Sequence, residues 1–176
     1  GLFQLFQNPK QNMVFEKNEH FHTYLGLRNP RKLYWSKFGG KKLWPMGKGS
    51  HPRLHLNDKW ASYINLNKKV IYFKNFNDDV LNFSIKLKSI LNPYFIPEVI
   101  MLNKETVIYT DVNNKGLTGI ISFNRSTKKS EVIHKTSEVS TRIELCQSKS
   151  SIFVGLFPYT SPYKSHIYKF EKGSIN

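Results

Sequence analysis

The residues of this chain that could carry chemistry point away from catalysis. A glycosidase needs two carboxyl groups that face each other across a sugar, but the 12 acidic residues lie mostly beside turns or in charged loops. Serine is frequent, yet no Gly-x-Ser-x-Gly elbow presents one as a nucleophile. The sequence also lacks a glycine-rich phosphate motif. We therefore predict a protein that is not an enzyme, has no catalytic residue and uses no cofactor.

Histidines are the best candidates for metal ligands. His20 and His22 are two residues apart, which on a strand places both rings on one face, and His51 and His55 follow later. Three of them could hold a zinc ion. Polar positions on a half-exposed strand are the simpler interpretation, so we predict no metal site. Cys146 lies in an alternating run and is predicted to be a buried small hydrophobic residue.

The strongest signal is the placement of positive charge. Lys and Arg total 27 against 12 acidic residues, which gives a net charge of +15 and favours anionic partners. No acidic residue occurs from His20 to Asn57, and two tryptophans are interleaved there with the basic residues, as in surfaces that use aromatic stacking. A loop with two tyrosines near the C-terminus is a second candidate. The predicted binding residues are Arg28, Arg31, Lys32, Trp35, Lys37, Lys41, Lys42, Trp44, Lys48, Tyr159 and Tyr163.

Strands must position these residues, because helical periodicity is scarce. Short β-branched and aromatic runs alternate with clusters of Asn, Gly, Lys and Pro, which predicts an all-β protein. The run 79–90 also fits strand alternation better than a helical stripe. The other predicted strands are 21–27, 32–38, 60–64, 70–76, 106–110, 119–123, 152–157 and 166–170.

The predicted strands repeat along the chain. A strand that combines aliphatic and aromatic residues returns four times, beginning at Leu33, Ile71, Ile120 and Ile167. Each is preceded by a strand with an aromatic residue, at Tyr24, Tyr63, Tyr109 or Phe153. A repeat of ~40–50 residues with about four strands is typical of a β-propeller blade.

One repeat also resembles a known family. His51-Pro52-Arg53-Leu54-His55-Leu56-Asn57-Asp58-Lys59-Trp60-Ala61-Ser62-Tyr63, followed by Ile71-Tyr72-Phe73, is similar to the TolB-like propeller repeat. The match is best over residues 50–77. It departs from the family pattern where His55 and Leu56 stand for Ser-Pro and Asn57-Asp58 for Asp-Gly. The resemblance implies a β-propeller fold.

We predict a single β-propeller domain over residues 1–176 with about four blades of four antiparallel strands. The predicted blades are 12–48, 49–90, 94–136 and 139–170. The N-terminal strand 2–6 is predicted to supply the outer strand of the last blade, which would close the ring and remove an exposed edge. The alternative is that these residues are part of a larger propeller.

The first functional hypothesis is a non-enzymatic scaffold that binds an anionic partner. Resemblance to TolB-like repeats implies a periplasmic or secreted bacterial protein that docks onto another envelope protein. The alternatives are a glycan-binding or glycan-processing propeller and, less favoured, non-specific nucleic-acid binding. The excess of Lys over Arg argues against sequence-specific DNA recognition but permits binding through backbone phosphates. The competing interpretation of Trp35 and Trp44 is that they fill space between blades. No apolar run is long enough for a membrane-spanning helix.

Overall fold

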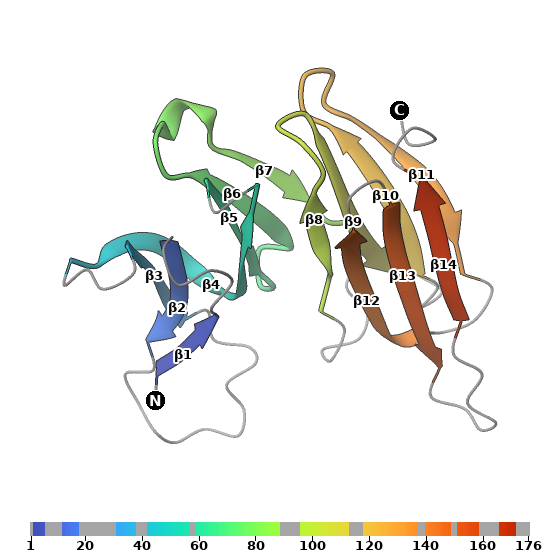
Figure 1. Cartoon of the computed structure of the whole chain (residues 1–176), viewed down its shortest axis with the longest axis horizontal. Coiled ribbons are helices and arrows are strands. Elements are labelled where there is room, and N and C mark those ends of the chain that lie inside the picture. The colour runs from blue at the N-terminus through green and yellow to red at the C-terminus, as the bar shows by residue number, and fades with distance from the viewer. Residues whose placement is uncertain are drawn as a thin grey trace. The chain divides into compact units, whose positions relative to one another are not determined.

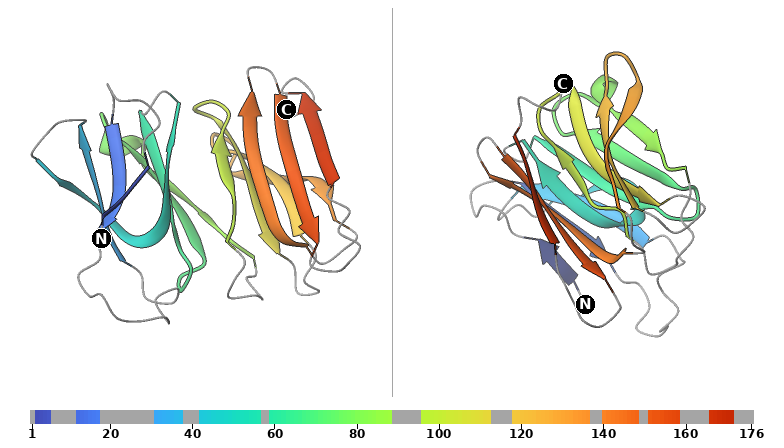
Figure 2. Two further views of the ribbon diagram at one scale, coloured as in Figure 1. Left: turned by 60° about the horizontal axis from the view of Figure 1, so that its bottom comes forward. Right: turned by 90° about the vertical axis from the view of Figure 1, so that its right-hand side faces the viewer.

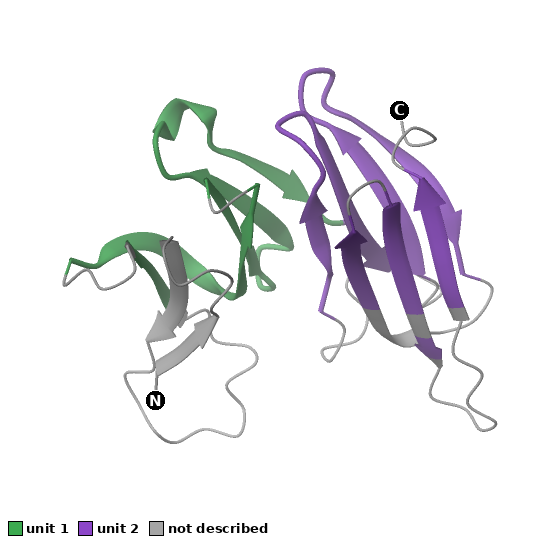
Figure 3. Cartoon of the chain, viewed as in Figure 1, with its two compact units in different colours: residues 1–87 green, residues 88–176 purple. Residues whose placement is uncertain are grey.

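The computed structural model describes residues 2–5, 12–17, 31–37, 42–56, 59–88, 96–112, 118–136, 140–148, 151–158 and 166–171. The chain divides into two compact units, unit 1 at Gly1–Leu87 and unit 2 at Lys88–Asn176 (Figure 3). The elements of the described residues are antiparallel strands and one short 3-10 helix. The predicted all-β class is therefore confirmed.

Unit 1 contains a seven-stranded antiparallel sheet in which each strand pairs with its neighbours in sequence (Figure 1). The 3-10 helix η1, Asp79–Leu81, lies between the last two strands. The strands are β1 (Leu2–Leu5), β2 (Asn12–Lys17), β3 (Arg31–Lys37), β4 (Trp44–His55), β5 (Trp60–Asn65), β6 (Val70–Asn75) and β7 (Phe83–Lys86).

Strand β4 belongs to two antiparallel groups. Its first half pairs with β3, ending at Arg31 opposite Gly49, and its second half pairs with β5, beginning at Ser50 opposite Ile64. The register shifts after Ser50, and His51 adopts a φ of 52°, so the strand changes direction between the two halves. The groups β1–β4 and β4–β7 enclose a core of buried residues: Leu33, Met46, Leu54, Ala61 and Tyr63.

Aromatic rings fill the space within the second of these groups. Trp60 and Phe73 are each 1% exposed. Phe73 stacks on Phe83 of β7 with centroids 4.4 Å apart, and Trp60 meets the edge of the same ring at 5.8 Å. Buried rings of this size contribute much of the apolar area that stabilises a small β-sheet protein.

Unit 2 consists of two sheets that appear as separate layers in Figure 2. The four-stranded sheet has the order β11-β10-β9-β8, and the three-stranded sheet has the order β12-β13-β14. Ile108 and Ile120 from the first sheet pack with Leu145 and Ile152 from the second in one buried core. The strands are β8 (Val99–Met101), β9 (Thr106–Val112), β10 (Thr118–Asn124), β11 (Lys129–Lys135), β12 (Ser140–Ser148), β13 (Ser151–Pro158) and β14 (His166–Glu171).

The predicted role of the N-terminal strand is wrong. β1 forms an antiparallel pair with β2, with Leu2 opposite Lys17 and Leu5 opposite Val14. Among the described strands, the β12-β13-β14 sheet does not include β1. A pairing between neighbouring strands closes a short loop and costs less chain entropy than a pairing between the two ends of the chain.

The run 79–90 is a strand only in part. The Asp78 side chain accepts a hydrogen bond from the N–H of Val80, which starts the 3-10 helix η1, and β7 begins only at Phe83. The predicted strand 21–27 lies outside the described residues. The number and the limits of the blades stay a prediction.

Candidate binding surface

Two tryptophans from neighbouring strands form the centre of the candidate site. Trp35 of β3 and Trp44 of β4 are opposite each other in the sheet, and their rings stack with centroids 4.3 Å apart and an interplanar angle of 15°. Trp35 also contacts Phe76, at 4.5 Å between centroids. The Lys42 ammonium lies over the Trp44 ring, 5.4 Å from its centroid. We call these four residues the aromatic stack.

The aromatic stack connects the core of unit 1 with its surface. Trp35 is half-buried and packs against the core cluster of unit 1, whereas Lys42 is exposed. Between Lys42 and Trp44 lies Leu43, which is 46% exposed. Trp35 therefore fills space as the competing interpretation expected, while Trp44 holds a lysine at the surface through a cation–π contact that contributes about 0.5–1 kcal/mol at exposed sites.

A second basic group lies further along the same two strands. Lys32 of β3 and Lys48 of β4 are direct cross-strand partners, and both are exposed. Like charges in directly opposite positions of a sheet repel each other. The pair therefore concentrates positive charge on this part of the surface of unit 1.

Two of the remaining predicted site residues lie on a described strand. Arg31 and Lys37 are placed on β3, opposite Gly49 and Asn12 respectively. The others lie outside the described residues: Arg28, Lys41, Tyr159 and Tyr163.

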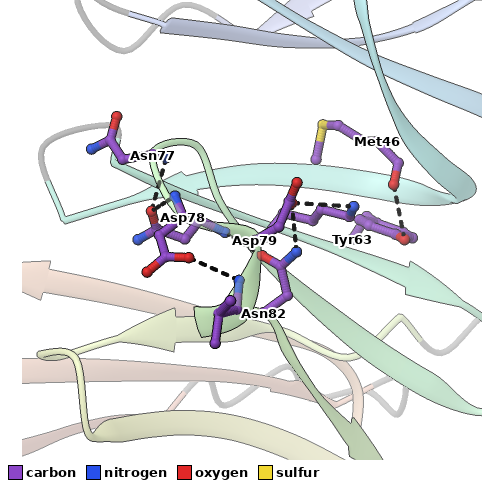
Figure 4. A network of polar contacts seen from close by, with 9 residues as sticks. Met46, Tyr63, Asn77, Asp78, Asp79 and Asn82 are labelled. Atoms are coloured by element: carbon purple, nitrogen blue, oxygen red, sulfur yellow. Dashed lines mark hydrogen bonds and ion pairs between the residues drawn. The ribbon is translucent and has the colours of Figure 1, made fainter.

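A tyrosine fixes the part of β4 between Trp44 and Lys48. Tyr63 packs against β4 so closely that a Cβ atom on Gly47 would lie 2.2 Å from its hydroxyl oxygen. A Cβ on Gly49 would lie 2.6 Å from the backbone oxygen of Ile64. The Tyr63 hydroxyl donates a hydrogen bond to the carbonyl of Met46 at 3.3 Å (Figure 4). Burial raises the pKa of Tyr63 above its ordinary value, so the donor stays protonated at neutral pH.

A polar network orders the loop that follows β6, next to Phe76 (Figure 4). Asn75 Oδ1 accepts the backbone N–H groups of Asn77 and Asp78, at 2.9 and 3.0 Å. The Asn82 side chain donates to Asp79 at 2.8 Å. Among the residues of unit 1 whose side chains are described, the acidic ones are Asp78 and Asp79. The described negative charge of this unit is therefore confined to one loop.

The structure corrects the interpretation of His55. This histidine is 8% exposed rather than half-exposed, and its Nε2 is hydrogen-bonded to Ser62 Oγ at 2.8 Å. Burial, with a smaller contribution from the positive charge of Arg53, lowers the pKa of His55 to about 3. His51 Nδ1 is hydrogen-bonded to Ser50 Oγ at 2.9 Å. Both histidines of this repeat therefore take part in local hydrogen bonds.

The prediction for Cys146 is also wrong. The Cys146 side chain is exposed, because its neighbour Leu145 occupies the core-facing position of β12 and adjacent residues of a strand face opposite sides. His20 and His22 lie outside the described residues. Within the part of the chain that the structure describes, no three His, Cys, Asp or Glu side chains are grouped to hold a metal ion.

Known proteins resemble this chain in fold but not in sequence. No protein-family model and no curated protein sequence matches it. The β-propeller domain of the Trilobed protease from Pyrococcus furiosus, described as having an open velcro topology, is similar with a TM-score of 0.55 and 14% identity, over 91% of this chain and 50% of that one. The WD40 domain of SCAP from fission yeast matches with a TM-score of 0.51 and 11% identity, over 95% and 41%.

TolB from Acinetobacter baumannii is a further neighbour, with a TM-score of 0.48 and 8% identity over 89% of this chain and 40% of that one. The predicted propeller-type fold is confirmed by the two matches with TM-scores above 0.5, to the protease domain and the WD40 domain. This chain spans half or less of the length of each of the three solved structures. The described residues include no helix that is long and apolar enough to cross a membrane.

Proposed function

We propose that this chain is a non-enzymatic binding β-propeller that recognises an anionic protein through the basic surface of unit 1. The observation that carries the proposal is the aromatic stack, in which a core-anchored pair of tryptophans presents the Lys42 ammonium at the surface. A cation held in this way loses little side-chain entropy when it pairs with a carboxylate. Resemblance to TolB-like repeats supports a role as a scaffold that docks onto another protein of the bacterial envelope.

Neighbouring groups cover the faces of the Trp35 and Trp44 rings, and this favours a protein as the binding partner over a sugar or a nucleic acid. Bases and sugars are held on open aromatic faces, but Trp35 lies between Trp44 and Phe76, and Lys42 covers Trp44. The exposed side chain of Leu43 offers instead an apolar contact beside the cation. A peptide with both carboxylates and apolar side chains can use both features.

The test compares three probes at ~50 and ~200 mM salt, a range over which binding through phosphates alone weakens strongly. The probes are a glutamate-rich peptide that carries one leucine, a heparin fragment and a single-stranded oligonucleotide of similar charge. The proposal predicts that the peptide retains most of its affinity at the higher salt concentration, because the apolar contact is not screened. Tighter binding of heparin or the oligonucleotide at that concentration contradicts it.

A matched pair of double variants locates the contact. Lys42→Gln with Trp44→Ala is expected to weaken peptide binding at least fivefold, because the cation and the ring that holds it at the surface are both lost. Lys135→Gln with Phe157→Ala in unit 2 makes the same change in charge and removes a half-buried aromatic ring. Equal losses in the two variants would assign the binding to net charge and overturn the proposed site.

A further inference from the structure

We propose that five exposed lysines at one end of the seven-stranded sheet form a row that binds an extended acidic segment of a polypeptide across the strands. The row consists of Lys32, Lys48, Lys68, Lys69 and Lys86. Three of them, Lys68, Lys69 and Lys86, lie outside the basic region that the sequence indicates. The inference rests on the proposed function and deepens it, since it names the chemistry of the partner.

The first half of the row is connected by a buried asparagine. Lys32 and Lys48 are cross-strand partners on β3 and β4. Asn65, at the end of β5 and 6% exposed, donates its side-chain N–H to the carbonyl of Lys48 at 3.1 Å. Its Oδ1 accepts the backbone N–H of Lys68 at 3.0 Å. One side chain therefore holds the backbone of Lys48 beside the turn that carries Lys68.

The second half of the row follows from the pairing of β6 with β7. The turn between β5 and β6 closes with a hydrogen bond from the Lys69 N–H to the carbonyl of Leu66, at 3.2 Å. The Lys69 carbonyl accepts the N–H of Leu87 at 2.8 Å. Val70 is the cross-strand partner of Lys86. The turn between β5 and β6 is thus adjacent to the end of β7. Lys69 and Lys86 therefore lie at the same end of the sheet as Lys48.

The described acidic side chains of unit 1 lie away from this row. Asp78 and Asp79 follow the C-terminal end of β6, whereas Lys69 precedes its N-terminal end. Asp79 is also engaged locally, by Asn82 and by an ion pair with Lys74 at 4.0 Å. The lysine row is therefore a strip of positive charge at the other end of β6 from the described acidic side chains of unit 1, and such a strip attracts an anionic chain.

Strand geometry gives the length of the partner segment. The second half of β4, which begins two residues after Lys48, is three strand spacings from β7, which carries Lys86; this is about 14 Å at ~4.8 Å per spacing. Alternate side chains of an extended peptide are about 7 Å apart, so three carboxylates on one face span that distance. A short extended segment with acidic residues at alternate positions therefore matches the row.

The chemistry of the row favours a polypeptide over a nucleic acid. It contains only lysine and no aromatic ring on which the bases of a single strand could stack. Neighbouring rings of unit 1 stack on one another and not outward, Tyr63 on Tyr72 at 5.1 Å and Phe73 on Phe83 at 4.4 Å. One face of each of these rings is therefore occupied by its neighbour and is closed to a base.

The test uses a polyglutamate peptide, whole wild-type protein and two triple variants with equal charge. Lys68→Gln, Lys69→Gln and Lys86→Gln together are expected to weaken polyglutamate binding about tenfold at low salt, because three ion pairs are lost. The control replaces three exposed lysines of unit 2, Lys104→Gln, Lys129→Gln and Lys135→Gln, and is expected to change the affinity less than twofold. Similar losses in the two variants, or no loss in the first, overturn the proposal.

Two further arms identify the partner class and separate this inference from the proposed function. An oligonucleotide of equal charge that binds more tightly than polyglutamate, and loses affinity in the first variant, would overturn the polypeptide assignment. If the row variant weakens binding while Lys42→Gln with Trp44→Ala does not, the row stands and the aromatic stack fails as the site. The reverse result overturns the row and leaves the proposed function in place.

Discussion

Because His55 is buried and neutral, we predict that this protein loses stability in mild acid. The folded-state pKa is lowered from 6.5 to about 3. Between these values the unfolded chain binds a proton at this side chain and the folded chain does not, so the free energy of unfolding falls as the pH decreases. The contribution is fully present above pH 6.5 and is lost as the pH falls toward 3.

The size of the effect follows from the same two pKa values. Each pH unit below 6.5 costs about 1.4 kcal/mol for one proton, which gives about 3 kcal/mol by about pH 4.5. This is a large fraction of the free energy of unfolding of a typical domain, which is ~5–15 kcal/mol. The loss is expected because the His55 ring is buried, so that a charged form would lose its hydration.

Urea unfolding at a series of pH values tests this prediction on the wild type and on His55→Gln. Glutamine retains a polar group that can reach Ser62 but does not titrate, and the carboxylates titrate equally in both proteins. The difference in unfolding free energy between wild type and variant should therefore shrink by about 3 kcal/mol from about pH 7 to about pH 4.5. Parallel pH profiles for the two proteins would refute the assignment of a buried neutral histidine.

Three other predictions concern the packing that supports the surface. Gly49→Ala should destabilise the protein by about 1–3 kcal/mol in urea unfolding, because its Cβ would lie 2.6 Å from the Ile64 carbonyl oxygen; an unchanged midpoint would contradict this close contact. Phe73→Ala should cost about 3–5 kcal/mol, since it removes a fully buried ring stacked on Phe83, and a cost below 1 kcal/mol would contradict the described packing. Cys146 should react with iodoacetamide in the folded protein at a rate close to that in urea, and strong protection would contradict its exposure.

Strand positions were predictable from local pattern because each side chain alternates between core and solvent. The predicted strand 70–76 matches β6, where Ile71 and Phe73 are buried and Tyr72 is only half-buried. The alternation does not encode which strands pair with each other, so the partner of β1 could not be read from residues 2–6. The start of β7 depended on a cap by Asp78, a side-chain hydrogen bond that competes with strand structure.

The candidate site was predictable only where its residues are close in sequence. Trp35 and Trp44 stand in one acid-free region, and a short connection brings their strands together. Lys68, Lys69 and Lys86 are brought beside Lys48 by sheet order and by the Asn65 hydrogen bonds. A search for continuous basic segments cannot detect a row that runs across strands.

The central claim, that unit 1 binds an acidic polypeptide through the aromatic stack and the lysine row, is tested most directly by NMR. The isotope-labelled protein is titrated with the leucine-bearing acidic peptide, and the backbone amide shifts are followed residue by residue. The account predicts that the largest changes fall at Lys42, Trp44, Lys48, Lys68 and Lys86. Changes centred on the lysines of unit 2, or changes spread evenly over both units, would contradict it.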